Sequence, residues 1–120
     1  MAQAQFVHIG DAIDHTPAAD VAAGDVVEVG TLPLVARHDI PAGALGSLAM
    51  KGVFDVVKAT GAITVGALVY WDNDGDPVGG VADSGAATTT PTDNNVMGRA
   101  VAAAASADET VRVKLMQPTA

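Results

Sequence analysis

The sequence contains no cysteine, which excludes disulfide bonds, thiolate catalysis and cysteine-based zinc sites. It has only six Lys and Arg residues against fourteen Asp and Glu residues, so its formal net charge is −8. The six bases are scattered along the chain, whereas binding to the phosphates of a nucleic acid needs clustered Lys or Arg. We therefore expect no nucleic-acid partner.

Long hydrophobic runs are also missing. No uncharged apolar stretch approaches the ~20 residues of a membrane-spanning helix, and the longest Ala/Val run covers only residues 100–105. The N-terminal residues lack the basic region and the apolar run of a signal peptide. We expect a protein without a membrane partner that is made and assembled inside the cell.

Only four residues are aromatic, and only two of the fourteen acids are Glu. The remaining acids are Asp, which favours turns and disfavours helix interiors, so the composition argues against an α-helical protein. Most of the apolar residues are Ala and Val. Because an Ala side chain buries little area, we expect a modest core and a subunit that gains stability from its partners.

Glycine, proline, Asp and Asn divide the chain into short apolar runs. Residues 110–116 alternate most regularly and place Val111, Val113 and Leu115 on one face. Residues 100–107 also suit a helix by propensity, but alternation from Val96 onward favours a strand. The pattern predicts an all-β fold, a compact small barrel or sandwich of about seven short strands. The predicted strands cover residues 6–9, 26–29, 34–37, 48–57, 67–71, 96–103 and 110–116.

A chain of 120 residues has the size of a single domain. We divide it into an N-terminal arm or first strand over residues 1–10, one β domain over residues 11–117, and a tail over residues 118–120. Within the domain, residues 82–95 are all small or polar. They predict one long exposed loop.

Three segments share a β-branched residue, two further residues and a glycine before a predicted strand. These glycines are Gly24, Gly43 and Gly66. Glycine adopts the positive φ of a type II turn without steric cost. The pattern predicts a repeated turn, and an internal duplication is the alternative.

Aspartates alternate at Asp72, Asp74 and Asp76. A calcium loop begins in this way, because hard cations need several oxygen ligands that converge on one point. However, the twelfth position of a loop that begins at Asp72 is Asp83 instead of a bidentate Glu. A turn between two strands has the same composition. We favour the turn and expect no metal, with calcium at these three residues as the alternative.

The tripeptide Ala49-Met50-Lys51 resembles part of the Ala-Met-Lys-Met hairpin that carries biotin in carboxylase carrier domains. Gly52 replaces the second Met, and Leu48 stands where Glu is usual. A group attached to Lys51 is therefore an alternative, and we expect no cofactor.

No motif for catalysis is present. The serines lack the Gly-x-Ser-x-Gly frame of a hydrolase nucleophile. There is no Gly-x-x-x-x-Gly-Lys-Ser/Thr loop, and the three histidines have no metal-binding spacing. We predict no catalytic residue and no enzyme activity.

The order of the segments closely resembles the capsid cement or head-decoration proteins of tailed phages and prophages. The most specific pieces are Gly-Val-Phe at residues 52–54, Gly-x-x-Val-Tyr-Trp-Asp at residues 66–72, and Gly-x-Ala at residues 98–100. The resemblance covers nearly the whole chain. It implies a compact all-β subunit that binds the outer face of an assembled capsid and stabilises it, without catalysis or a cofactor.

The resemblance also implies the partners and the location. The partners would be the phage major capsid protein and further copies of this chain, in a homotrimer, with a dimer as the alternative. The protein would lie on the capsid exterior of the virion after assembly in the bacterial host cytoplasm. The alternative is a small β binding or carrier module, with Ca²⁺ at residues 72–76 or a group on Lys51. We predict that the arm and the exposed loop make the contacts, through Gln5, Phe6, Val7, His8, Thr88, Thr89, Thr90 and Pro91.

Overall fold

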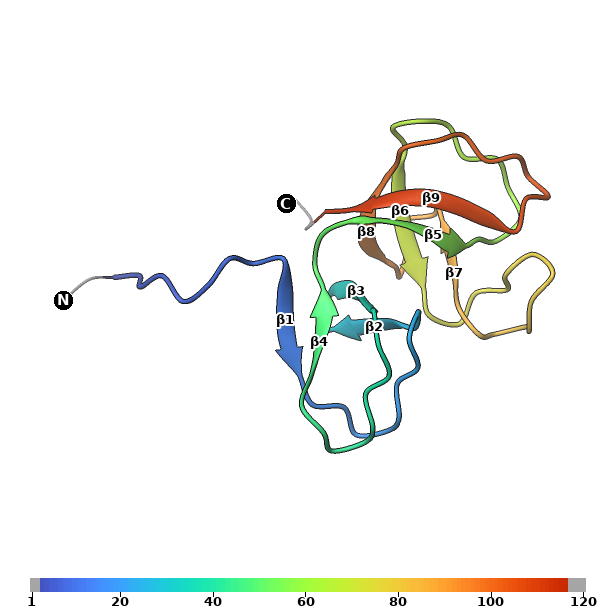
Figure 1. Ribbon diagram of the computed structural model, residues 1–120. Coiled ribbons are helices and arrows are strands. Elements are labelled where there is room, and N and C mark those ends of the chain that lie inside the picture. The colour runs from blue at the N-terminus through green and yellow to red at the C-terminus, as the bar shows by residue number, and fades with distance from the viewer. Residues whose placement is uncertain (1–2, 117–120) are drawn as a thin grey trace.

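The structure is a computed structural model that describes residues 3–116. In this part of the chain there are nine strands in two antiparallel sheets and no helix (Figure 1). The all-β prediction is confirmed. No helix that could cross a membrane occurs among these residues.

The first lobe is a four-stranded sheet of residues 12–49, with strand order β1-β4-β3-β2. Its core holds Leu34, Ala36, Ile40 and Leu48, all at most 1% exposed. The segment predicted over residues 26–29 is a strand with these bounds. The strands are β1 (Ala12–His15), β2 (Val26–Val29), β3 (Leu32–Ala36) and β4 (Gly46–Ala49).

The second lobe is a five-stranded sheet of residues 53–115, with strand order β5-β9-β8-β6-β7. A bridge between Lys58 and Ala87 joins its first and last strands, and the amide of Ala59 donates to the carbonyl of Ala87 at 2.9 Å. The sheet therefore closes into a small barrel. Its strands are β5 (Val53–Val57), β6 (Leu68–Asp72), β7 (Ala86–Thr88), β8 (Asn95–Ala100) and β9 (Thr110–Leu115).

The two lobes are joined by packing and by hydrogen bonds. Val35 of β3 belongs to the core cluster of the second lobe. The carboxylate of Glu28 accepts hydrogen bonds from the side-chain amides of Asn73 at 3.0 Å and Asn95 at 2.7 Å. These contacts hold β2 and β3 against the second lobe. The division into an arm, a domain over residues 11–117 and a tail stays a prediction, and residues 1–2 and 117–120 lie outside the described residues.

The structure corrects four predicted segments, and one of them is the strand predicted over residues 96–103, which ends at Ala100. Residues 6–9 are not a strand, because no neighbouring strand pairs with them; β1 begins only at Ala12. The strand predicted over residues 48–57 is interrupted after Ala49, and Gly52 has a φ of 123°. The loop predicted over residues 82–95 contains β7, whose Ala86 and Ala87 are fully buried. Their small side chains fit the closed barrel.

The repeated glycine turns are confirmed. Gly24, Gly43 and Gly66 have φ values of 93°, 77° and 85°, as the third position of a type II turn requires. The turns come in pairs, because Val21 bridges Ile40 in the first lobe and Ile63 bridges Ala104 in the second. The turn after Ala104 has no glycine, so the sequence motif did not reveal it.

Candidate interaction surfaces

The N-terminal arm projects away from both lobes (Figure 1). Its large apolar side chains are exposed: Phe6 by 80%, Val7 by 83% and Ile9 by 72%. The predicted contact residues Gln5, Phe6, Val7 and His8 all lie on it and are exposed. Burial of each large apolar side chain in an interface is worth roughly 1.5–3 kcal/mol before the cost of ordering the arm. The arm can therefore contribute substantial binding energy.

The base of the arm is fixed to the body. The amide of Met50 donates to the carbonyl of Asp11 at 2.9 Å. Nζ of Lys51 lies 3.7 Å from Oδ1 of Asp11, in an ion pair whose side chains are both exposed. The arm thus leaves the molecule beside the link between β4 and β5.

The second predicted contact segment follows β7. Thr88 is half-buried at the end of β7, whereas Thr89, Thr90 and Pro91 are exposed. Local hydrogen bonds shape the loop: the amide of Thr90 donates to Oγ1 of Thr88 at 3.2 Å, and Asn94 donates to the carbonyl of Thr90 at 3.0 Å. In Figure 1, β7 lies on the side of the second lobe away from the arm. The structure does not bring the two predicted segments together.

The aspartate segment after β6 forms a turn. The amide of Gly75 donates to the carbonyl of Asp72 at 3.1 Å, and Oδ1 of Asp76 accepts the amide of Asp83 at 2.8 Å. A hydrogen bond with the Asp74 side chain, followed by burial, raises the pKa of Asp72. Among residues 3–116 no group of three or more His, Cys, Asp or Glu is placed to hold a metal ion. The turn does not close a tight hairpin, because β7 begins only at Ala86.

Lys51 lies in the bend between β4 and β5, with its side chain 63% exposed. These two strands belong to different sheets. Lys51 is therefore not at the tip of a hairpin, unlike the biotin-carrying lysine that its neighbours resemble.

Lys58 is a buried cation that the sequence did not single out. It is 0% exposed, and its Nζ donates to the carbonyls of Ala105, Ser106 and Asp108 at 3.1, 3.0 and 3.4 Å. Three acceptors satisfy the three donors of an ammonium group, which a buried charge requires. Lys58 thereby holds the glycine-free turn of residues 105–108 against the barrel.

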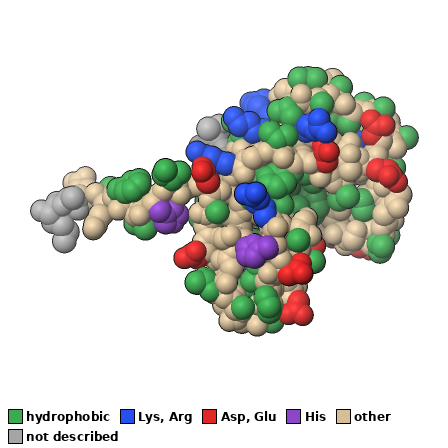
Figure 2. Space-filling view, viewed as in Figure 1, with side chains coloured by type: hydrophobic (Ala, Val, Ile, Leu, Met, Phe, Trp, Pro, Cys, Tyr) green, Lys and Arg blue, Asp and Glu red, His purple; other side chains and the backbone are tan. Residues whose placement is uncertain are grey.

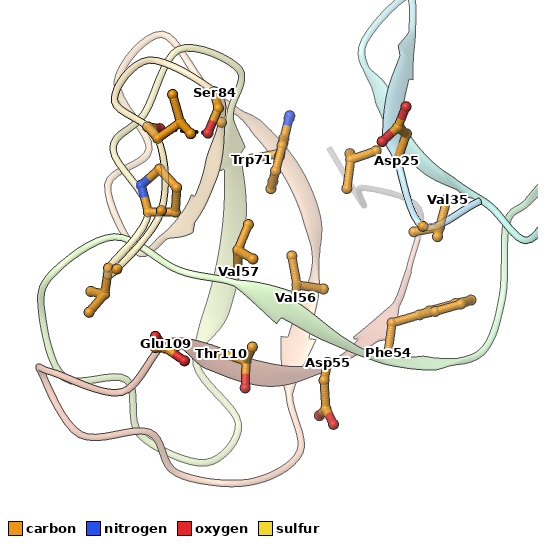
Figure 3. A pocket seen from close by; sticks show the side chains of 18 of the residues that line it. Asp25, Val35, Phe54, Asp55, Val56, Val57, Trp71, Ser84, Glu109 and Thr110 are labelled. Atoms are coloured by element: carbon orange, nitrogen blue, oxygen red, sulfur yellow. Dashed lines mark hydrogen bonds between the residues drawn. The ribbon is translucent and has the colours of Figure 1, made fainter. Parts of the chain in front are cut away.

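A groove of about 780 Å³ lies along the seam between the lobes (Figure 3). Val35 of the first lobe faces Val56 and Trp71 of the second across it, and Asp25 and Glu109 lie at its sides. The groove is thus apolar inside and acidic at its margins.

The outer face of the barrel carries basic and apolar side chains. On β9 the exposed residues Arg112 and Lys114 alternate with buried ones. Arg112 forms two hydrogen bonds with Asp55, opposite it on β5, at 2.9 and 3.2 Å. The guanidinium of Arg112 holds the pKa of Asp55 below its usual value. We call this surface the basic face, and it consists of Lys51, Val53, Leu68, Arg99, Val101, Arg112 and Lys114.

Comparison with known proteins identifies the family. The family model of the phage cement proteins matches residues 7–115, which is nearly the whole chain. The chain therefore belongs to the phage cement protein family, a family of structural virion proteins, and the predicted resemblance is confirmed. Comparison with curated proteins and with solved structures finds no match. Family membership supports a capsid-stabilising role in association with the phage capsid.

Proposed function

We propose that this protein binds the outer surface of an assembled phage capsid and stabilises the shell as cement, without catalytic activity. The major capsid protein is the partner, and several copies act together as a homotrimer or a dimer. Assembly takes place in the host cytoplasm. The observation that carries the proposal, beside the family, is the arm, which exposes Phe6, Val7 and Ile9 where a partner can cover them.

The stabilisation follows from mass action. A protein that binds the assembled lattice and not the loose capsid subunits shifts the equilibrium toward the shell. Because many copies bind one shell, a modest gain for each copy adds up to a large effect. Negative net charge limits non-specific aggregation of the unbound protein, so that it stays available for the shell.

Removal of the arm tests this function. Shells of the major capsid protein alone are mixed with the intact protein or with a variant that lacks residues 3–9. We expect the intact protein to sediment with the shells and to raise their disassembly temperature, and the variant to lose most of its occupancy. A matched variant, Thr89→Ala with Thr90→Ala, measures the contribution of the loop.

Two outcomes contradict the proposal. One is an intact protein that does not sediment with shells. The other is full occupancy by both variants, since neither predicted contact segment would then bind. An added mass on Lys51 of the purified protein would favour the carrier module instead.

A further inference from the structure

Charge is distributed unevenly over the molecule. The net charge is −8, and only six residues are Lys or Arg. Four of these six, scattered along the sequence, lie on one surface, the basic face. This surface is therefore locally positive on an acidic protein.

The strand register assembles this face. Val53 of β5 pairs with Lys114 of β9, Lys114 pairs with Arg99 of β8, and Arg99 pairs with Leu68 of β6. These four side chains form one row across the outside of the barrel. The next row runs from Asp55 through Arg112 to Val101, whose amide donates to the carbonyl of Arg112 at 2.9 Å. Apolar side chains thus flank the two basic ones of the first row on both sides, and in the second row Arg112 lies between Asp55 and the apolar Val101.

The bases on this face differ in their partners. Arg112 is paired with Asp55, and Lys51 is paired with Asp11. Within the described part of the chain, neither Arg99 nor Lys114 has a carboxylate oxygen within 4 Å. Arg99 gives one donor to the carbonyl of Gly66 at 2.8 Å. Its remaining donors and the ammonium of Lys114 are available to a partner.

The basic face is continuous with the base of the arm. The amide of Leu115 donates to the carbonyl of Gly52 at 2.9 Å, which places Lys51 beside the end of β9. Lys51 in turn contacts Asp11, where the arm begins. Figure 2 shows basic side chains with hydrophobic ones among them on the part of the second lobe nearest the arm. The arm and the basic face therefore lie next to each other on the molecule.

We propose that the basic face docks on an acidic, partly apolar patch of the capsid's outer surface, beside the place where the arm binds. The proposal rests on the proposed function and adds the face and the chemistry of its partner. An acidic patch attracts this face and repels the other surfaces, which carry most of the fourteen acids. Charge complementarity thus orients each copy as it approaches the shell.

Two exposed bases without carboxylate partners make the test specific. In the variant Arg99→Glu with Lys114→Glu, we expect shell affinity to fall at least about tenfold at low salt, because like charges then face each other. We expect the affinity of the intact protein to fall as NaCl rises from 0.05 to 0.5 M. The matched control is Arg37→Glu, an exposed base of the first lobe outside this face, which should leave affinity within about twofold. Thermal melts confirm that all variants are folded.

A zero-length carbodiimide cross-linker, which joins amines to carboxylates, then identifies the partner. We expect cross-links from Lys51 and Lys114 to Asp or Glu residues of the major capsid protein. Cross-links from Lys114 to a second copy of this chain would overturn the proposal. The proposal would also be overturned if double-stranded DNA retained the intact protein and not the double variant, because the basic face would then bind a nucleic acid.

The result also separates this proposal from the proposed function. If the intact protein binds shells and the double variant binds equally well, the basic face is not the contact and this inference is wrong. If the intact protein does not bind shells at all, the proposed function fails and this inference fails with it.

Discussion

Both lobes are antiparallel β-sheets, but they differ in how fully the sheet closes and in how many residues are buried in the core. The first lobe is an open sheet whose fully buried cluster has only four residues. The second lobe closes on itself through Lys58 and Ala87 and buries a larger cluster, to which the first lobe contributes Val35. A closed barrel leaves no unpaired edge, whereas an open sheet does. The second lobe is therefore the larger and more fully closed framework, and the first lobe carries the arm.

The lobes also differ in charge. Residues 3–50 contain six acids and one base, whereas residues 51–116 contain eight acids and five bases. One of those five bases, Lys58, is buried, and the other four belong to the basic face. The framework lobe thus supplies the positive surface, although both lobes hold more acids than bases. We infer that the second lobe combines the more fully closed core with the basic docking face, and that the first lobe supplies the projecting arm.

The largest effect should come from breaking the barrel at Gly98. A Cβ atom at this position would overlap the carbonyl oxygen of Lys114, so Gly98→Ala forces β8 away from β9. We expect destabilisation of at least ~3 kcal/mol, measured by urea unfolding. The control is Gly10→Ala in the arm, where nothing lies within 4 Å, and it should change stability little. Equal stability of the two variants would show that the barrel tolerates a wider strand spacing.

A smaller effect should follow from Lys58→Met, which keeps the apolar stem and removes the ammonium group. Three carbonyl groups of the turn over residues 105–108 then lose their donor. We expect a loss of about 2–3 kcal/mol, with faster hydrogen exchange in that turn and in β5. Lys114→Met, at an exposed position, should change stability by less than ~0.5 kcal/mol. A similar loss in both variants would contradict the role given to the buried ammonium.

The smallest effect concerns the contribution of two aspartates with opposite pKa shifts to the stability of the fold. It is measured as the dependence of the melting temperature on pH. The pKa of Asp55 is lowered by Arg112, so this pair stabilises the fold above the ordinary value of 3.8, and the contribution is lost as the pH falls through the lowered pKa. The pKa of Asp72 is raised by Asp74, so its ionised form opposes folding at neutral pH, and this opposition disappears as the pH falls through the raised pKa.

Two variants separate these contributions. At pH 7, Asp55→Asn should lower the melting temperature, whereas Asp72→Asn should raise it. Both differences from the intact protein should shrink toward pH 3. If both variants changed the melting temperature in the same direction at pH 7, the opposite pKa shifts assigned to Asp55 and Asp72 would be wrong.

Much of the local structure could be predicted. The strand over residues 26–29 and the alternation of residues 110–115 follow from side-chain period, and the turns at Gly24, Gly43 and Gly66 follow from the freedom of glycine. The apolar residues 6–9 were wrongly expected to form a strand, because hydrophobicity alone does not provide a pairing partner. β7 was missed because its alanines carry no β signal, although their small size lets the barrel close.

The candidate site was less predictable. Arm residues such as Phe6 and Val7 were expected as contacts, and that remains a prediction, although their exposure supports it. The basic face was not expected, since Lys51, Arg99 and Lys114 are far apart along the chain. Within a single segment, only Arg112 and Lys114, which alternate with apolar residues, indicated an exposed basic face.

The amino-acid sequence by itself determined the all-β class, the glycine turns and the family, because these depend on local composition, on period and on the order of motifs. Only the tertiary structure decided the closure of the barrel, the burial of Lys58 and the row of Val53, Lys114, Arg99 and Leu68. The physical reason is strand register. A shift of the register by one residue reverses which side chains point outward. Pairing between strands that are distant in the sequence sets this register.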